Sequence, residues 1–107
     1  MSGPGGMDIN KMMQQVQQMQ AEMARVQEEL AHETVEASAG GGAVKVVANG
    51  ASELVSIEIS PEAIDPEDPE LLADMIVGAV NEALRSANEL AQSRLGGLAG
   101  GLGLPGL

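Results

Sequence analysis

The chain has 107 residues, no aromatic residue and no cysteine, and its formal net charge is −11. Without cysteine it has no disulfide and no thiolate metal site, and its acidic balance opposes binding to polyanions such as nucleic acid. No apolar run approaches the roughly 20 residues of a membrane-spanning helix, and the first residues lack the pattern of a signal peptide. We therefore expect one small cytoplasmic domain whose aliphatic core gains stability from dimerisation.

A heptad of apolar residues predicts a long first helix, which follows a flexible Gly/Pro-rich start at residues 1–7 and runs to about His32. The apolar spacings alternate between three and four residues, which places one narrow seam along the helix. The seam consists of Ile9, Met12, Val16, Met19, Met23, Val26 and Leu30. Such a seam needs a partner: the second helix of the chain, a second subunit or both. A free-standing parallel coiled coil is disfavoured, because the flanking positions bring no opposite charges together.

Three short strands are predicted next, at residues 33–38, 43–48 and 53–60, because the apolar period changes to two. Glycines at 40–42 favour a turn after the first strand, and Asn49-Gly50 favours a hairpin after the second. These short connections predict an antiparallel meander whose third strand has one apolar face. That face carries Val55, Ile57 and Ile59.

A second long helix is predicted from Asp68 as N-cap and Pro69 as first helical residue to about Leu95, where Gly96-Gly97 would end it. Its inner face consists of Leu72, Ile76, Val80, Ala83, Ala87, Leu90 and Ala91. Residues 96–107 are predicted to form a Gly-rich disordered tail. The fold class is then α+β, a single α-β-β-β-α domain at residues 8–95.

Residues with catalytic or metal-binding chemistry are scarce. His32, the single histidine, stands at the predicted end of a helix, where the negative helix terminus favours it. The acidic stretch around Asp65 and Glu70 lacks the ligand spacing of an EF-hand, so we interpret it as a solvated loop. No catalytic residue, metal, cofactor or small-molecule substrate is therefore predicted, and the protein is not expected to be an enzyme.

Basic residues are few, and they are the available contacts for phosphate. The candidate DNA-binding residues are Lys11, Arg25, Arg85 and Arg94, and the fifth base is Lys45. Lys11 and Arg25 are 14 residues apart, which places them on one face of the first helix about four turns from each other.

The ordered set of segments resembles the YbaB/EbfC family of bacterial nucleoid-associated proteins over residues 8–107. The segments that carry the resemblance are KMMQQVQQMQAEMARVQEEL, VKVVANG, VSIEISPEAI and LLADMIVGAVNEALRSA. Asn49-Gly50, Ile59-Ser60-Pro61 and the Ala-x-Asn-x-Ala run at 79–83 match the family at positions of the fold. The resemblance implies an α-β-β-β-α protomer, a homodimer with projecting helices, and DNA binding with little sequence preference.

Two functions remain open from the sequence. The first is a non-enzymatic, nucleoid-associated homodimer that binds duplex DNA weakly and without sequence specificity. The alternative is an acidic protein–protein adaptor that docks through its Met/Gln-rich helix. The position of the bases on the folded surface distinguishes them, because phosphate binding needs bases that gather on one side.

Overall fold

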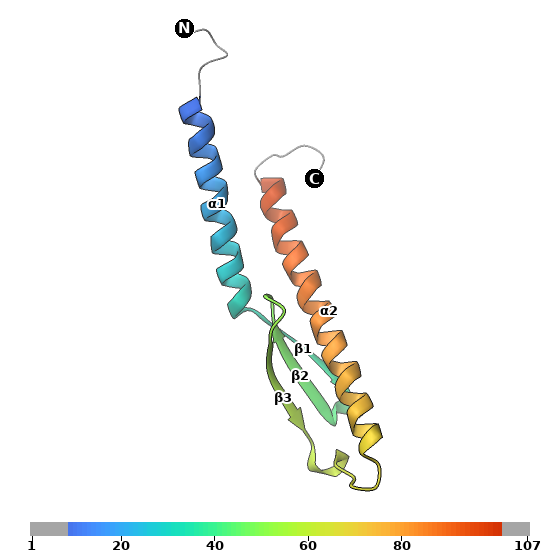
Figure 1. Cartoon of the computed structure of the whole chain (residues 1–107). Helices are drawn as coiled ribbons and strands as arrows, with labels where there is room; N and C mark the ends of the chain where they lie inside the picture. Colours follow the sequence, from blue (N-terminus) through green and yellow to red (C-terminus); the bar gives the residue numbers. More distant parts are fainter. Residues whose placement is uncertain (1–8, 102–107) are drawn as a thin grey trace.

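The computed structural model describes residues 9–101 and has the predicted order of elements. Helix α1 (Ile9–His32) leads into strands β1 (Thr34–Ala39), β2 (Val44–Asn49) and β3 (Leu54–Ile59), and helix α2 (Pro69–Gly101) follows. Short 3-10 turns at Gly40–Gly42 and Pro61–Ala63 complete the chain. The molecule is elongated, with extents of 80 × 22 × 17 Å. Figure 1 shows α1 and the C-terminal half of α2 extending beyond the sheet in the same direction.

The sheet is an antiparallel meander in the order β1-β2-β3, as predicted. Its central strand carries the core, because the side chains of Val44, Val46 and Ala48 are fully buried. Helix α2 covers this face with three alanines spaced by four residues, at 79, 83 and 87, which are also fully buried. Their small side chains let the backbone of α2 approach the sheet closely, so the core is thin and wholly aliphatic.

Strand β3 remains largely uncovered, because α2 packs on β1 and β2. Ile57 pairs with buried Val46 across the ladder and therefore points to the same face of the sheet. Its exposure is nevertheless 41%, and that of its neighbour Val55 is 55%. The predicted apolar face is confirmed for Ile57 and Ile59, but a register shift leaves Val55 unpaired and places Leu54 opposite buried Ala48. This face has no covering element among residues 9–101.

The two predicted turns need glycine for different reasons, one for its backbone conformation and the other for close packing. Gly40, Gly41 and Gly42 all have positive φ, as expected for a turn that only glycine adopts easily. Gly50 does not have a positive φ. In the β2–β3 turn the residue in the left-handed region is Ser52, with a φ of 63°. Gly50 is needed for close packing instead, since a Cβ atom there would lie 2.8 Å from the backbone oxygen of Leu30. The hairpin is confirmed, although the reason for its glycine differs from the one expected.

Asn49 joins the end of α1 to the β2–β3 hairpin. Its amide nitrogen donates to the backbone oxygen of Ala31 (3.2 Å) and to the Glu53 carboxylate (2.8 Å). Its amide oxygen accepts hydrogen bonds from the backbone N–H groups of Ala51 (2.9 Å) and Glu53 (3.1 Å). The backbone N–H of Gly50 adds a bond to the Leu30 oxygen at 2.8 Å. These bonds fix the direction in which α1 leaves the sheet.

Helix α2 begins as predicted and ends later than predicted. The Asp68 carboxylate accepts a hydrogen bond from the backbone N–H of Leu71 at 3.2 Å, and Pro69 is the first helical residue. The expected end near Leu95 is wrong, because the helix continues through Gly96 and Gly97 to Gly101. A glycine inside a helix costs only about 1 kcal/mol relative to alanine, and half-buried Leu98 lines the same cleft as Val26 of α1. Residues 96–101 thus belong to α2, whereas the rest of the predicted tail and residues 1–7 lie outside the described residues.

The heptad seam of α1 is covered only at its C-terminal end. Val26 and Leu30 are 5% and 3% exposed, because α2 and the β2–β3 turn pack against this part of the helix. Met19 is half-buried, and the exposed fractions of Ile9 and Met12 are 68% and 64%. Partnering by the second helix is therefore confirmed for the last turns of α1, while its first half projects without a partner among residues 9–101.

Candidate nucleic-acid interface

Charge is distributed unevenly along the molecule. Residues 9–21 of α1, here called the acid-free segment, contain Lys11 and no acidic residue. Residues 62–74, here called the acidic segment, contain six acidic residues and no base. Figure 1 shows that the acid-free segment forms one end of the molecule, whereas the link from β3 to α2 forms the other. The net charge of −11 is thus concentrated away from the projecting part of α1.

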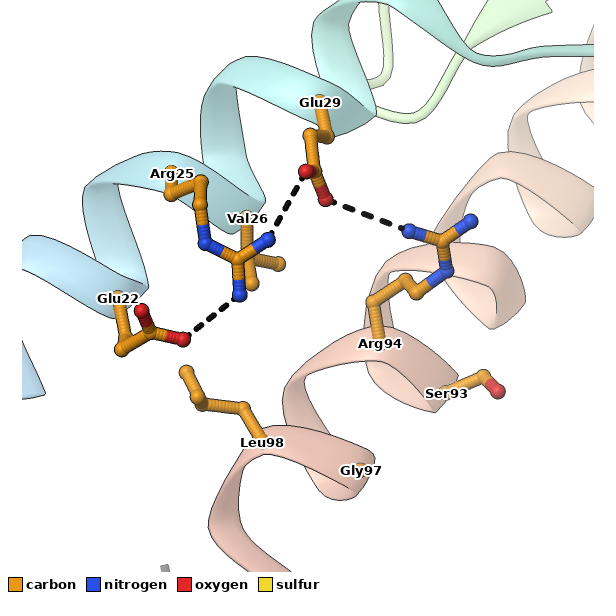
Figure 2. Close-up of a pocket in the computed structure, with 8 residues that line it drawn as sticks. All are labelled: Glu22, Arg25, Val26, Glu29, Ser93, Arg94, Gly97 and Leu98. Carbon is orange, nitrogen blue, oxygen red and sulfur yellow. Dashed lines mark hydrogen bonds and ion pairs between the residues drawn. The ribbon is translucent and has the colours of Figure 1, made fainter. Parts of the chain in front are cut away.

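Arg25 lies between two glutamates of its own helix. Its guanidinium group contacts the Glu22 carboxylate at 2.6 Å and the Glu29 carboxylate at 2.9 Å (Figure 2). These partners lie three residues before and four residues after Arg25, which are neighbouring positions on a helix surface. The hydrogen bond from Arg25, together with its positive charge, holds the pKa of Glu22 below its ordinary value.

Glu29 also connects the two helices. Its second carboxylate oxygen lies 3.7 Å from the guanidinium group of Arg94 on α2 (Figure 2). Arg94 in turn contacts Glu33, just beyond the end of α1, at 2.5 Å. The two arginines therefore share one glutamate, and the side chains of all four residues are partly exposed to solvent.

An open cleft of about 460 Å³ lies between α1 and α2, and its charged lining residues are Glu22, Arg25, Glu29 and Arg94. Val26 and Leu98 provide apolar lining, and Ser93 and Gly97 complete the α2 side. The cleft has room for a small anionic group, and its two guanidinium groups are the type of donor that binds carboxylate or phosphate with two parallel hydrogen bonds.

The structure brings together only two of the four predicted DNA-binding residues, Arg25 and Arg94. Lys11 lies about 21 Å from Arg25 along α1, given a rise of 1.5 Å per residue. Arg85 lies farther back on α2, exposed and paired with Glu82. Lys11 has no carboxylate partner within residues 9–101, and the same holds for Lys45.

The glutamates that pair with these arginines were not among the residues predicted from the sequence. The pairing of Arg25 with Glu22 and Glu29 could have been found from their three- and four-residue spacings. The contact between Glu29 and Arg94 could not, because it depends on how α1 packs against α2. The predicted basic residues are therefore mostly engaged in ion pairs, and Lys11 is the base of the acid-free segment.

Other kinds of site find no support among residues 9–101. No three carboxylate or imidazole groups there are close enough together to hold a metal ion. His32 is exposed at the last position of α1. The helices of this part of the chain include none with the length and apolarity needed to cross a membrane.

Proteins with similar sequences and a protein with a similar structure are known. A nucleoid-associated protein of Pelotomaculum thermopropionicum is 61% identical over 102 residues, covering 95% of this chain and 97% of that protein. One from Thermoanaerobacter pseudethanolicus is 56% identical over 104 residues, covering 97% and 94%. The crystal structure of an uncharacterised Helicobacter pylori protein superimposes with a TM-score of 0.72 at 25% identity, covering 81% of this chain and 91% of that one.

A family model matches almost the whole chain, from residue 5 to residue 102. This match includes α1, the three-stranded sheet and α2 in full, so it covers every element described above. The chain belongs to the YbaB/EbfC DNA-binding family.

Proposed function

We propose that this protein binds duplex DNA with little sequence preference, as a homodimer, and that it is a non-enzymatic component of the nucleoid. Its family and the names of its relatives support DNA as the partner. The observation that carries the proposal is the charge separation between the acid-free segment and the acidic segment. A net charge of −11 opposes DNA binding by the protein as a whole. The charge separation resolves this conflict, because the acidic segment can face away from DNA while the acid-free segment approaches it.

The contacts available at this end favour binding to the DNA backbone. Lysine and arginine bind phosphate oxygens irrespective of sequence, which gives affinity and orientation without base recognition. The acid-free segment adds uncharged side chains that hydrogen-bond to phosphate or sugar: Gln14, Gln15, Gln17, Gln18 and Gln20. Few charges are available in each protomer, so binding is weak, and it depends on two protomers contributing together.

A matched pair of lysines tests the proposed surface. Lys11 and Lys45 are both exposed and without a carboxylate partner within residues 9–101, but Lys45 lies in the sheet, beside Glu58 on the paired strand. Replacing either with glutamine changes the net charge equally. We expect Lys11→Gln to weaken binding to a duplex of mixed sequence several times more than Lys45→Gln, as measured by fluorescence anisotropy at low salt.

The salt dependence provides a second measurement. The logarithm of the binding constant should fall with the logarithm of salt concentration by about 0.9 for each neutralised phosphate, and Lys11→Gln should reduce this slope. Equal effects of the two substitutions would show that the acid-free segment is not the contact surface. Absence of binding by the wild-type protein even at low salt would remove DNA as the partner.

The second candidate function is a protein–protein adaptor, and the exposed apolar stripe at the start of α1 favours it. Ile9, Met12, Met13 and Val16 are all more than half exposed and border one open apolar groove. Methionine-rich helix faces adapt to partners of different shape. A wild-type protein that fails to bind DNA but whose α1 stripe is protected from oxidation by a protein partner would favour this function.

A further inference from the structure

Within residues 9–101, Glu29 is the only carboxylate that forms ion pairs with two different arginines. Its two oxygens contact two different guanidinium groups, Arg25 on α1 at 2.9 Å and Arg94 on α2 at 3.7 Å. Glu22 and Glu33 each contact one of these arginines from the outside. Two positive charges are thus surrounded by three negative charges at the cleft where α1 and α2 separate.

A carboxylate and a phosphate bind a guanidinium group in the same way, through parallel N–H···O hydrogen bonds. Both therefore compete for the same donors, and an arginine that is paired with glutamate offers fewer of them to DNA. Ion pairs that are exposed to solvent are weak and exchange readily, and the side chain of Glu29 is 45% exposed. A phosphate that enters the cleft can thus displace this carboxylate.

We propose that Glu29 sets the DNA affinity of this protein by occupying Arg25 and Arg94, and that its carboxylate leaves both arginines when a DNA phosphate binds there. The inference rests on the proposed DNA-binding function and extends the contact surface from the acid-free segment to the neighbouring cleft. It also assigns the cleft a ligand, a phosphate of the DNA backbone. If the ion pairs only hold α1 against α2, the opposite result is expected, and removing the Glu29 carboxylate should weaken DNA binding.

The neighbouring residue provides the control. Glu28 is exposed on the same helix and has no ion pair within residues 9–101. Glu29→Gln and Glu28→Gln change the net charge identically, so their difference isolates the contact with the arginines. We expect Glu29→Gln to bind duplex DNA about three- to tenfold more tightly than Glu28→Gln, which corresponds to the release of weak exposed ion pairs.

A second variant leaves the net charge unchanged. Glu29→Asp shortens the side chain by one methylene group, so that it no longer reaches both guanidinium groups. This variant should also bind DNA more tightly than the wild type, and its thermal unfolding, recorded alongside, establishes that it is folded. Glu29→Gln should in addition steepen the salt dependence by about 0.9 for each phosphate gained.

The outcomes separate the two levels of the proposal. If the wild type binds DNA but Glu29→Gln binds no better than Glu28→Gln, Glu29 does not compete with phosphate, and the proposed function stands without this inference. If Glu29→Gln lowers both stability and affinity, the ion pairs are structural and the inference is wrong. If none of the variants binds duplex DNA at low salt, the proposed function fails and the inference falls with it.

Discussion

Asn49 determines how α1 is oriented, although it is a single amide at the end of a strand. It is 7% exposed and uses both its oxygen and its nitrogen, contacting the end of α1 and the β2–β3 turn. A buried polar group that loses its partners is destabilising by about 1–3 kcal/mol. The direction of the projecting helix thus depends on one residue that is far from any base.

The substitution Asn49→Asp tests this role with almost no change in shape. It replaces the donating NH₂ group with an oxygen that faces the backbone oxygen of Ala31 and the carboxylate of Glu53. We expect a loss of about 2–3 kcal/mol in the free energy of unfolding, measured by urea denaturation. Asn81→Asp, at an exposed position of α2, is the control and should change stability by less than about 0.5 kcal/mol.

The ion pair of Arg25 predicts a pH effect on its partner. Arg25 lowers the pKa of Glu22 in the folded protein, so the ion pair stabilises the fold when Glu22 is charged. This stabilisation is present above the pKa that Glu22 has in the unfolded chain, and it is lost as the pH falls through the pKa of Glu22 in the folded protein. In Arg25→Gln the pKa of Glu22 should rise toward its ordinary value, as followed by carboxyl carbon NMR. Arg85→Gln, whose ion pair is with Glu82, should leave the pKa of Glu22 where it was.

At the scale of elements, the sequence predicted helices and strands well because their periods differ. Seven seam positions in α1 and alternating residues in β3 each indicate one type of element, and Asp68-Pro69 marks the start of α2. The end of α2 was not predictable, because Gly96 and Gly97 weaken a helix only slightly while contact with α1 favours its continuation.

For the candidate site, the sequence predicted residue types but not their pairing. It identified Arg25 and Arg94 as bases, and the structure shows that they share Glu29. This contact joins residues that are 65 positions apart, between helices whose relative placement depends on the sheet and on Asn49. The spacing of residues within one helix or strand cannot predict a contact between side chains of two different elements.

The glycines of α2 predict an easy gain in stability. A Cβ atom added at Gly97 would meet nothing within 4 Å, and the residue lies inside the helix. Gly97→Ala should therefore raise the free energy of unfolding by about 0.5–1 kcal/mol, measured by urea denaturation. Gly41→Ala is the contrasting variant, because its surroundings are equally open but its φ is +68°, and it should lower stability by about 1–2 kcal/mol.

On the scale of the whole molecule, apolar side chains remain exposed at two separate places that matter for assembly, both within residues 9–101. One is the first half of the α1 seam, and the other is the face of β3 around Ile57. Either one could be covered by a second copy of the chain. The β3 face is continuous with the core under α2, since Ile57 pairs with fully buried Val46, so a second copy placed there extends an existing core.

We therefore expect the homodimer to form through the β3 face, leaving the acid-free segments of both protomers exposed. Ile57→Asp places a charge on this face and should produce a monomer, whereas Ser56→Asp, on the opposite face of the same strand, should remain dimeric. Light scattering at micromolar concentration distinguishes the two against a protomer mass of 10.9 kDa. A monomeric wild type would contradict the dimer, and a dimeric Ile57→Asp would place its interface elsewhere. Because a monomer offers half as many bases to one DNA duplex, the monomeric variant should also show a shallower salt dependence of DNA binding.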